Sequence, residues 1–303
     1  MLTSHCHGKG QVRVMKLFRS EQRHEVRQFL VETNLVGPVD ECFLKGDNSR
    51  IVATDTQKNT IFILAKQLNE NSKSAECFSM LVAKHFVTTY PEAITECKVT
   101  IEEEIWERAI IDGKPHHHGF QKVGPQLGHA FCHAVRNNEN KVVVKTLNGG
   151  VRGLTLLKTT QSAFENFLRD KFTVLPETKE RLLATSVEAT WVYLPVAIKE
   201  CSDFEEVASK IKQTMINAFT GPADIGVASA SLQETAFQMG KACVEIVPAI
   251  KNISLKLPNI HNIPFDFTAF GMGNKDASGF PDIFWVTKEP FGIIQATVSR
   301  PKK

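Results

Sequence analysis

The 303-residue sequence has no long apolar run and no paired cysteines. No stretch approaches the roughly 18 apolar residues that a membrane-spanning helix needs, and residues 1–11 lack the apolar core of a signal peptide. The seven cysteines are scattered, and no two have Cys-x-x-Cys spacing. They therefore favour reduced thiols in an intracellular protein over a disulfide framework, and no membrane partner is expected.

Charge of one sign is also scarce. The 36 lysines and arginines barely exceed the 33 acidic residues, for a formal net charge of +3. No basic stripe with interleaved aromatic residues is present, so nucleic-acid binding is not expected. The small positive excess modestly favours a small anionic ligand. The 42% of hydrophobic and 23% of charged residues are typical of a globular protein with a substantial core.

Two halves of the chain repeat an order of strand-like and helix-like patterns. Alternating or apolar segments predict strands over residues 11–18, 25–36, 96–105, 114–135 (as a pair of segments), 141–147, 152–158, 252–267 and 282–298. Apolar residues at helical spacing predict helices over residues 59–66, 78–86, 202–221 and 231–247. Antiparallel sheets with helices on one face would make an α+β fold. We expect two units, residues 1–138 and 139–303.

Local signals predict where several of these elements begin and end. Asn148-Gly149-Gly150 between two apolar segments predicts a hairpin turn. Asp55 is expected to cap the first helix, and Pro91 to end the second. Ser202 with Glu205 has capping-box spacing ahead of the third helix.

Five segments resemble the urate oxidase family. Residues 154–181 (LTLLKTTQSAFENFLRDKFTVLPETKER) are similar to the signature of that family, and residues 52–60 (VATDTQKNT) to its other diagnostic stretch. Gly8-Lys9, Ser231-Leu232-Gln233 and residues 257–261 (LPNIH) match further motifs. All five lie in the family's order and extend over most of the chain, so a chance match is excluded.

This resemblance implies a fold and an activity. The fold would be a pair of tandem T-fold (tunnelling fold) units, assembled as a homotetrameric barrel around a central tunnel. The activity would be oxidation of urate by dioxygen to 5-hydroxyisourate and hydrogen peroxide, without cofactor or metal. Active sites would lie at subunit interfaces, with Lys9, Thr54 and Asp55 from one chain and the other residues from a neighbour.

The resemblance also implies which residues bind urate, a flat anionic purine. Phe164 would stack on the purine, although its three-residue spacing from Phe167 also fits a helical core position. Arg181 would clamp one edge with two parallel N–H donors. Gln233 would pair with an amide edge, since its side chain both donates and accepts, and the Leu232 backbone N–H would add a donor. Leu232 stands where the family commonly has a smaller β-branched residue.

Further residues resemble the catalytic groups of the family. Thr54 and Asp55 stand at a helix start, where free N–H groups would receive the five-membered ring of urate. Lys9, Thr54 and His261 would relay a proton away from urate; lysine needs partial burial or a nearby cation to act as a base at neutral pH. Asn259 would hold dioxygen or water above the purine and donate a hydrogen bond to a developing peroxide.

A cluster of histidines supports a different reading. His116-His117-His118 with His129 and His133 could supply the three imidazoles of a zinc site, as in a zinc-dependent T-fold enzyme that acts on pterins. A chain that has lost activity and persists as a binding or structural protein is a further alternative. Every site residue that can be checked is intact, which argues against that last reading.

The resemblance implies a peroxisomal location. Family members of peroxisomal type end in a Ser-Lys-Leu-like tripeptide, whereas this sequence ends Arg300-Pro301-Lys302-Lys303. A cytoplasmic location is the alternative.

Overall fold

The computed structural model describes residues 1–21, 23–200, 203–277 and 279–301. The chain forms two compact units. Unit 1 comprises Met1–Arg152, Thr190–Ser209 and Ala249–Lys251, and unit 2 comprises Gly153–Ala189, Lys210–Pro248 and Asn252–Lys303. Three strands and one helix contribute residues to both units, and each unit is described by itself. The expected division after residue 138 stays a prediction.

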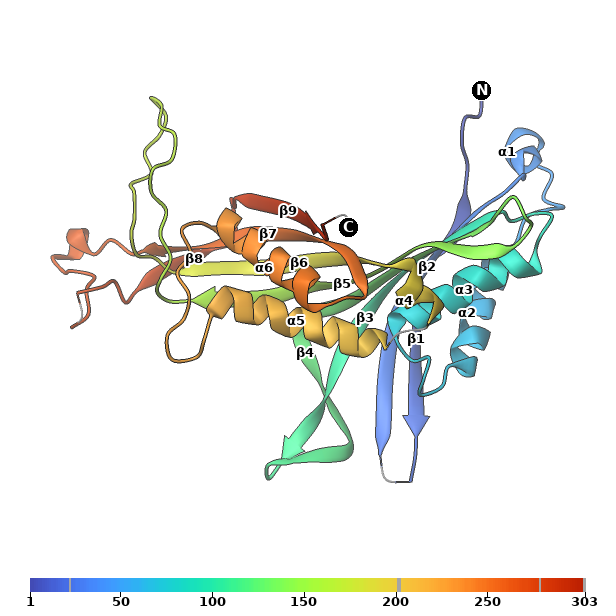
Figure 1. Ribbon diagram of the computed structural model, residues 1–303, viewed down its shortest axis with the longest axis horizontal. Coiled ribbons are helices and arrows are strands. Elements are labelled where there is room, and N and C mark those ends of the chain that lie inside the picture. The colour runs from blue at the N-terminus through green and yellow to red at the C-terminus, as the bar shows by residue number, and fades with distance from the viewer. Residues whose placement is uncertain (22, 201–202, 278, 302–303) are drawn as a thin grey trace. The chain divides into compact units, whose positions relative to one another are not determined.

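Unit 1 is built on an antiparallel sheet whose strands pair in chain order (Figure 1). The strands are β1 (His7–Arg19), β2 (His24–Val36), β3 (Glu96–Ile111), β4 (Lys114–Arg136) and the first part of β5 (Val142–Lys158). In β2 the alternate side chains of Phe29, Val31, Thr33 and Leu35 are fully buried. The two-residue period of a strand puts them on one face, which explains the alternation in the sequence.

Unit 1 also contains helices, some of which pack on this sheet. The helices are α1 (Asp40–Lys45), α2 (Thr54–Gln67), α3 (Ala75–Thr89) and α4 (Pro195–Lys199). Helices α2 and α3 contact each other, α2 packs on β1, and α3 packs on β3 and β4 (Figure 1). The Ser74 side chain caps α3 by accepting a hydrogen bond from the Cys77 N–H. The helix ends before Pro91, as predicted.

The prediction that Asp55 caps α2 is wrong. The helix begins at Thr54, five residues earlier than predicted, and its N-cap residue is Ala53, without a side-chain hydrogen bond. Asp55 is therefore the second residue of the helix. Its carboxylate accepts hydrogen bonds from Lys58 (2.5 Å) and Asn59 (2.9 Å) on the next turn.

The predicted hairpin turn at residues 148–150 is also wrong. Strand β5 runs through it without a break, with Gly149 opposite Ala130 of β4. A Cβ atom on Gly149 would lie 2.5 Å from both Glu76 Oε1 and Trp191 Nε1. Glycine is thus required by a close approach of side chains and not by a turn. Residues 114–135, expected as two strand segments, form the single strand β4.

Unit 2 has its own strands and helices. They are the end of β5, β6 (Leu183–Tyr193, except its last residues), β7 (Ile250–Pro264, except its first two residues), β8 (Phe284–Thr287), β9 (Ile293–Ser299), most of α5 (Phe204–Thr220), α6 (Leu232–Ile246) and the short η1 (Thr268–Phe270). Strand β7 pairs antiparallel with β8 and β9. Residues 282–298, expected as one strand, divide into β8 and β9. Strand β6 was not predicted, although every second residue from Leu183 to Tyr193 is buried.

The ends of the unit 2 helices follow local rules. Ser231 Oγ accepts a hydrogen bond from the Glu234 N–H, and the Glu234 carboxylate accepts one from the Ala230 N–H. The predicted helix over residues 231–247 is thereby confirmed. The predicted cap Ser202 lies outside the described residues. Asp203 accepts a hydrogen bond from the Glu206 N–H at the start of α5.

The two units confirm the α+β class, antiparallel strands with packed helices. In the described part of the chain, no helix has the length and apolar character that a membrane crossing needs.

Candidate active site

A cavity of about 630 Å³ in unit 2 brings together four of the predicted site residues. They are Phe164, Arg181, Asn259 and His261. These residues come from two stretches almost 80 positions apart at their closest, so the fold and not sequence proximity assembles the site. Polar side chains of Thr159, Thr160, Thr178 and Glu180 also line it, together with Phe280 and Phe284.

Phe164 and Arg181 are held by two short backbone pairings. The Phe164 N–H donates to the Thr178 carbonyl (2.7 Å), and the Thr178 N–H donates back (3.0 Å). The Arg181 N–H donates to the Ser162 carbonyl (2.9 Å), and its Nε lies 3.4 Å from Ser162 Oγ. No helix occurs here, so the spacing of Phe164 and Phe167 does not reflect a helical core; their rings stack at 4.9 Å.

Arg181 brings a positive charge to the wall of this cavity. Its guanidinium carbon lies 5.2 Å from the centre of the Phe164 ring, a cation–π arrangement. Partial burial lowers the pKa of Arg181 from its usual value, but a guanidinium stays charged. Among the described residues, no carboxylate forms an ion pair with it. An arginine that is part-buried without a counter-ion is suited to receive an anion.

Asn259 and His261 come from the end of β7. They are two residues apart on a strand, so their side chains share one face. The Asn259 N–H donates to the Gly292 carbonyl (3.0 Å), and His261 is paired with Thr287 of β8. The Thr185 hydroxyl donates to the Pro258 carbonyl (2.8 Å). This end of β7 is thus fixed on both sides.

Leu232 and Gln233 begin α6, and neither is among the residues that line the cavity. Leu232 is buried and Gln233 is exposed. The segment before α6 nevertheless pairs with the segment that carries Phe164. The Ala163 N–H donates to the Ser229 carbonyl (2.9 Å). The structure therefore ties the start of α6 to the Phe164 segment without placing Gln233 in the cavity wall.

The other predicted residues, Lys9, Thr54 and Asp55, belong to unit 1. Lys9 lies near the start of β1, and Thr54 and Asp55 are the first residues of α2, where the helix leaves backbone N–H groups unused. Hydrogen bonding to Lys58, its charge and the charge of Lys9 lower the pKa of the Asp55 carboxyl. Helix α2 packs on β1, the strand that carries Lys9.

Two buried polar residues of unit 1 were missed in the sequence. Thr33 and Gln57 are both fully buried and hydrogen-bonded to each other (2.8 Å). A signal was present: Thr33 interrupts the apolar alternation of β2, and Gln57 lies on the stripe that α2 buries with Ile61 and Leu64.

The histidines do not form the alternative zinc site. The rings of His116 and His118 are 4.6 Å apart, but His129 lies eleven residues further along an extended strand that rises about 3.3 Å per residue. His133 Nε2 lies 2.7 Å from the Glu96 carboxylate. Burial and the charge of Arg152 lower the pKa of His129 to about 4. Among the described residues, no three His, Cys, Asp or Glu side chains gather as metal ligands.

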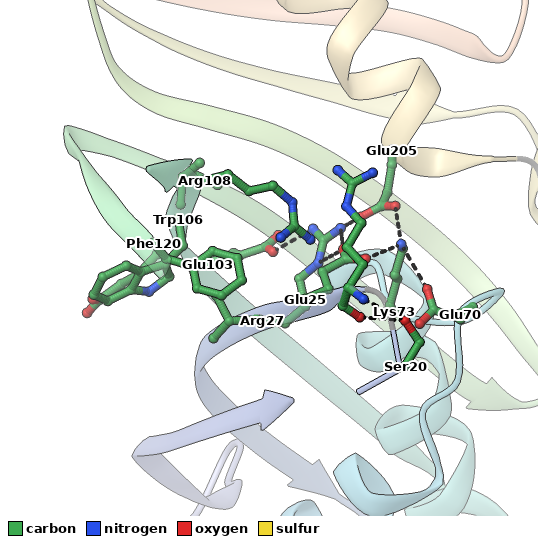
Figure 2. Close-up of a pocket in the computed structure, with 14 residues that line it drawn as sticks. Ser20, Glu25, Arg27, Glu70, Lys73, Glu103, Trp106, Arg108, Phe120 and Glu205 are labelled. Carbon is green, nitrogen blue, oxygen red and sulfur yellow. Dashed lines mark hydrogen bonds and ion pairs between the residues drawn. The ribbon is translucent and has the colours of Figure 1, made fainter. Parts of the chain in front are cut away.

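A second cavity, of about 720 Å³, lies in unit 1 and contains none of the predicted residues. Figure 2 shows Arg27 and Lys73 surrounded by carboxylates. Arg27 pairs with Glu25 (2.6 Å), Glu103 (3.0 Å) and Glu205, and Lys73 pairs with Glu25 (2.7 Å) and Glu70 (3.2 Å). Because these cations are already neutralised within the protein, this cavity is less suited to an anion than the one around Arg181.

Comparisons with known proteins agree with the motifs in the sequence. A family model described as Uricase matches residues 5–132 and 147–295. The chain is 41% identical over 305 residues to uricase-2 isozyme 2 of Glycine max, covering 97% of this chain and 94% of that protein. It is 40% identical to a uricase of Arabidopsis thaliana, with the same coverage.

Solved structures show the same fold. The uricase of Arthrobacter globiformis superposes with a TM-score of 0.86 at 31% identity, covering 100% of this chain and 96% of that chain. Urate oxidase from Bacillus sp. TB-90 superposes with a TM-score of 0.83, and its 22% identity supports the fold alone. The match of the family model in two successive segments fits the predicted tandem fold.

Proposed function

The chain belongs to the uricase family, and from this premise we propose that it oxidises urate with dioxygen to 5-hydroxyisourate and hydrogen peroxide. The observation that carries the proposal is the cavity of unit 2. It combines an aromatic ring, an amide, an imidazole and a guanidinium that has no ion-pair partner among the described residues. A flat anionic purine needs a cation in its plane and an apolar face above or below it.

Substrate binding would rest on Arg181 and Phe164. The guanidinium would donate two parallel hydrogen bonds to one edge of urate, each worth about 1.5–3 kcal/mol to a charged group. Phe164 would stack on the purine, for about 1–3 kcal/mol. Because Phe164 stacks on Phe167, urate would use the opposite face of its ring or take the place of Phe167. Gln233 and the Leu232 N–H, at the start of α6, would pair with the amide edge.

Proton removal and oxygen binding would use the other residues. Lys9 would accept the proton of urate through the Thr54 hydroxyl, which both accepts and donates. His261 would orient or charge-balance Lys9, and the N-terminal N–H groups of α2 at Thr54 and Asp55 would receive the five-membered ring. The Asn259 amide would donate to the developing peroxide.

The chemistry balances with these groups alone. Deprotonated urate gives two electrons to dioxygen, which takes two protons and becomes hydrogen peroxide. Water adds to the oxidised purine to give 5-hydroxyisourate. The electron-rich substrate is itself the reductant, so the proposal includes no cofactor and no metal.

Assembly and location are also proposals. The predicted residues divide between unit 1 (Lys9, Thr54, Asp55) and unit 2, and a homotetramer with active sites at subunit interfaces would supply the two groups from different copies. Sedimentation or light scattering at assay concentration would test this: a monomer with full activity would contradict an interfacial site. A peroxisomal location rests on the family resemblance.

The first experiment follows urate absorbance and oxygen uptake together, with protein pre-treated with chelator. Oxygen consumed in step with urate, with peroxide formed, would establish cofactor-free urate oxidation. Activity lost with chelator and restored by zinc would instead favour the metal-dependent alternative. Urate binding without turnover would favour the alternative that the chain has lost activity and persists as a binding or structural protein.

The proposed role of Lys9 as the general base has its own test. Lys9→Met should lower turnover by a large factor, about 10²–10⁴ for loss of a general base, while urate still binds. Lys45→Met, at an exposed lysine that pairs with Glu41, is the matched control. Unchanged turnover in Lys9→Met would refute the assignment.

A further inference from the structure

A chain of three hydrogen bonds in unit 1 connects the strand of Lys9 to the segment of Thr54. The Lys9 N–H donates to Thr33 Oγ1 (3.2 Å), and the Thr33 hydroxyl donates to Gln57 Oε1 (2.8 Å). Gln57 Nε2 then donates to the carbonyl of Val52 (3.0 Å). All three bonds run in the same direction, so each polarises the next.

Lys9 lies where the ordinary strand pairing is interrupted. The register of β1 against β2 shifts between Lys9 and Val12, and Gln11 has a φ of 59°. This is a bulge with one extra residue on β1, which leaves part of the ladder unpaired. The backbone approach is also close, since a Cβ on Gly8 would lie 1.8 Å from the Thr33 carbonyl oxygen. The Thr33 side chain supplies the acceptor for the Lys9 N–H at this irregular point.

The other end of the chain of bonds fixes the start of α2. Val52 lies two residues before Thr54, and the Gln57 N–H donates to the Ala53 carbonyl (3.0 Å). Gln57 therefore holds residues 52 and 53 through its side chain and its backbone. Its neighbours on the buried stripe, such as Ile61 and Leu64, are apolar. An apolar side chain would fill this position as well, so packing alone does not account for a fully buried amide.

We propose that Gln57 is a positioning residue that, through Thr33, sets the distance and orientation between Lys9 and Thr54. The inference rests on the proposed function, in which these two residues relay the proton of urate. A relay across a hydroxyl requires both neighbours within hydrogen-bond reach. A displacement of about 1 Å is enough to slow such a step strongly.

The kinetic test is Gln57→Met, which keeps the length of the side chain and removes the amide. We expect kcat to fall about tenfold while KM for urate changes less than about twofold, because Arg181 and Phe164 are untouched. In a Lys9→Met background, Gln57→Met should cause no further loss. A purely structural role predicts losses that multiply, and that result would overturn the inference.

The second arm uses Thr33. Thr33→Val removes the hydroxyl with little change of shape and should match Gln57→Met, whereas Thr33→Ser should retain most of kcat. Equal kcat in the two Thr33 variants would contradict the role of the hydroxyl. Ser79→Ala is the matched control, because Ser79 is also fully buried in unit 1 and donates to the Glu76 carbonyl (2.8 Å), away from Lys9. It should leave kcat unchanged.

A readout without urate separates this inference from the proposed function. Hydrogen exchange of the Lys9 amide should accelerate at least about tenfold in Gln57→Met and Thr33→Val, and should not change in Ser79→Ala. Unaltered exchange would overturn the positioning role even if the parent protein oxidises urate. If the parent does not oxidise urate, the proposed function fails, and the exchange result still decides whether Gln57 fixes Lys9.

Discussion

The Arg181 guanidinium lies over the Phe164 ring, and backbone hydrogen bonds to other residues hold both in place. Phe164 and Thr178 exchange two backbone hydrogen bonds, and the Arg181 N–H donates to the Ser162 carbonyl; the guanidinium carbon lies 5.2 Å from the ring centre. A cation and an aromatic face are thus fixed on a segment without helix or long strand. Under the proposed function, urate binding in this cavity depends on both.

Arg181→Lys should raise KM for urate by about 10- to 100-fold, because an ammonium cannot make two parallel hydrogen bonds in one plane. Steady-state kinetics and direct urate titration would measure it. Arg169→Lys is the control. Arg169 lies over Phe167 at 5.0 Å but does not line the cavity. Equal changes in the two variants would contradict the role of Arg181.

Phe164→Leu should weaken urate binding by about 1–3 kcal/mol, the usual contribution of base–aromatic stacking. The same titration would detect the resulting increase in Kd. Phe172→Leu, at a side chain of the same segment that is 77% exposed, should have little effect. If Phe164→Leu binds urate as the parent does, stacking on this ring is excluded.

Glu76 should make unit 1 less stable as the pH rises. Burial raises the pKa of its carboxyl from about 4.5 to about 8, and Tyr193 donates a hydrogen bond to it (2.8 Å). Between these two values the folded protein binds more protons than the unfolded chain, so the free energy of unfolding falls as pH increases from 4.5 to 8.

Glu76→Gln should remove most of that dependence, because the amide is neutral at every pH. Each pH unit between the two pKa values changes the free energy of unfolding by about 1.4 kcal/mol. Thermal melting from pH 5 to pH 8.5 would measure how steeply the stability changes with pH. Glu92→Gln, at an exposed residue, is the control. Identical slopes in the parent and Glu76→Gln would refute the prediction.

Gly149→Ala should destabilise the protein by about 1–3 kcal/mol through overpacking. The added methyl group would lie 2.5 Å from Glu76 Oε1 and from Trp191 Nε1. Urea denaturation would report the change. Gly273→Ala places a methyl group where nothing lies within 4 Å, and it should be tolerated. Equal denaturation midpoints in the two variants would show that the approach at Gly149 is relieved at no cost.

Local patterns in the sequence were sufficient for most of the elements. Alternation predicted β1 and β2, because one face of each strand is buried and the other is not. The helix over residues 231–247 and the stop before Pro91 were predicted correctly for the same kind of reason, since both follow from patterns among neighbouring residues. The motifs also identified the family, and four of their residues meet in one cavity.

Errors arose where a residue is required by a partner far away in the sequence. The pair Gly149-Gly150 was interpreted as a turn, but Gly149 is needed because Trp191 and Glu76 approach it. The error at Asp55 has a different, local cause: the predicted helix began five residues too late, and the carboxylate accepts hydrogen bonds from Lys58 and Asn59, three and four residues away.

The sequence by itself determined the family, the α+β class and the types of residue that the chemistry requires. Only the tertiary structure decided which of them meet: Arg181 with Phe164 and with β7 in one unit, and Thr33 with Gln57 in the other. The physical reason is that secondary structure follows from neighbours within a few positions, whereas a buried hydrogen bond or an unpaired cation depends on atoms brought together from distant segments.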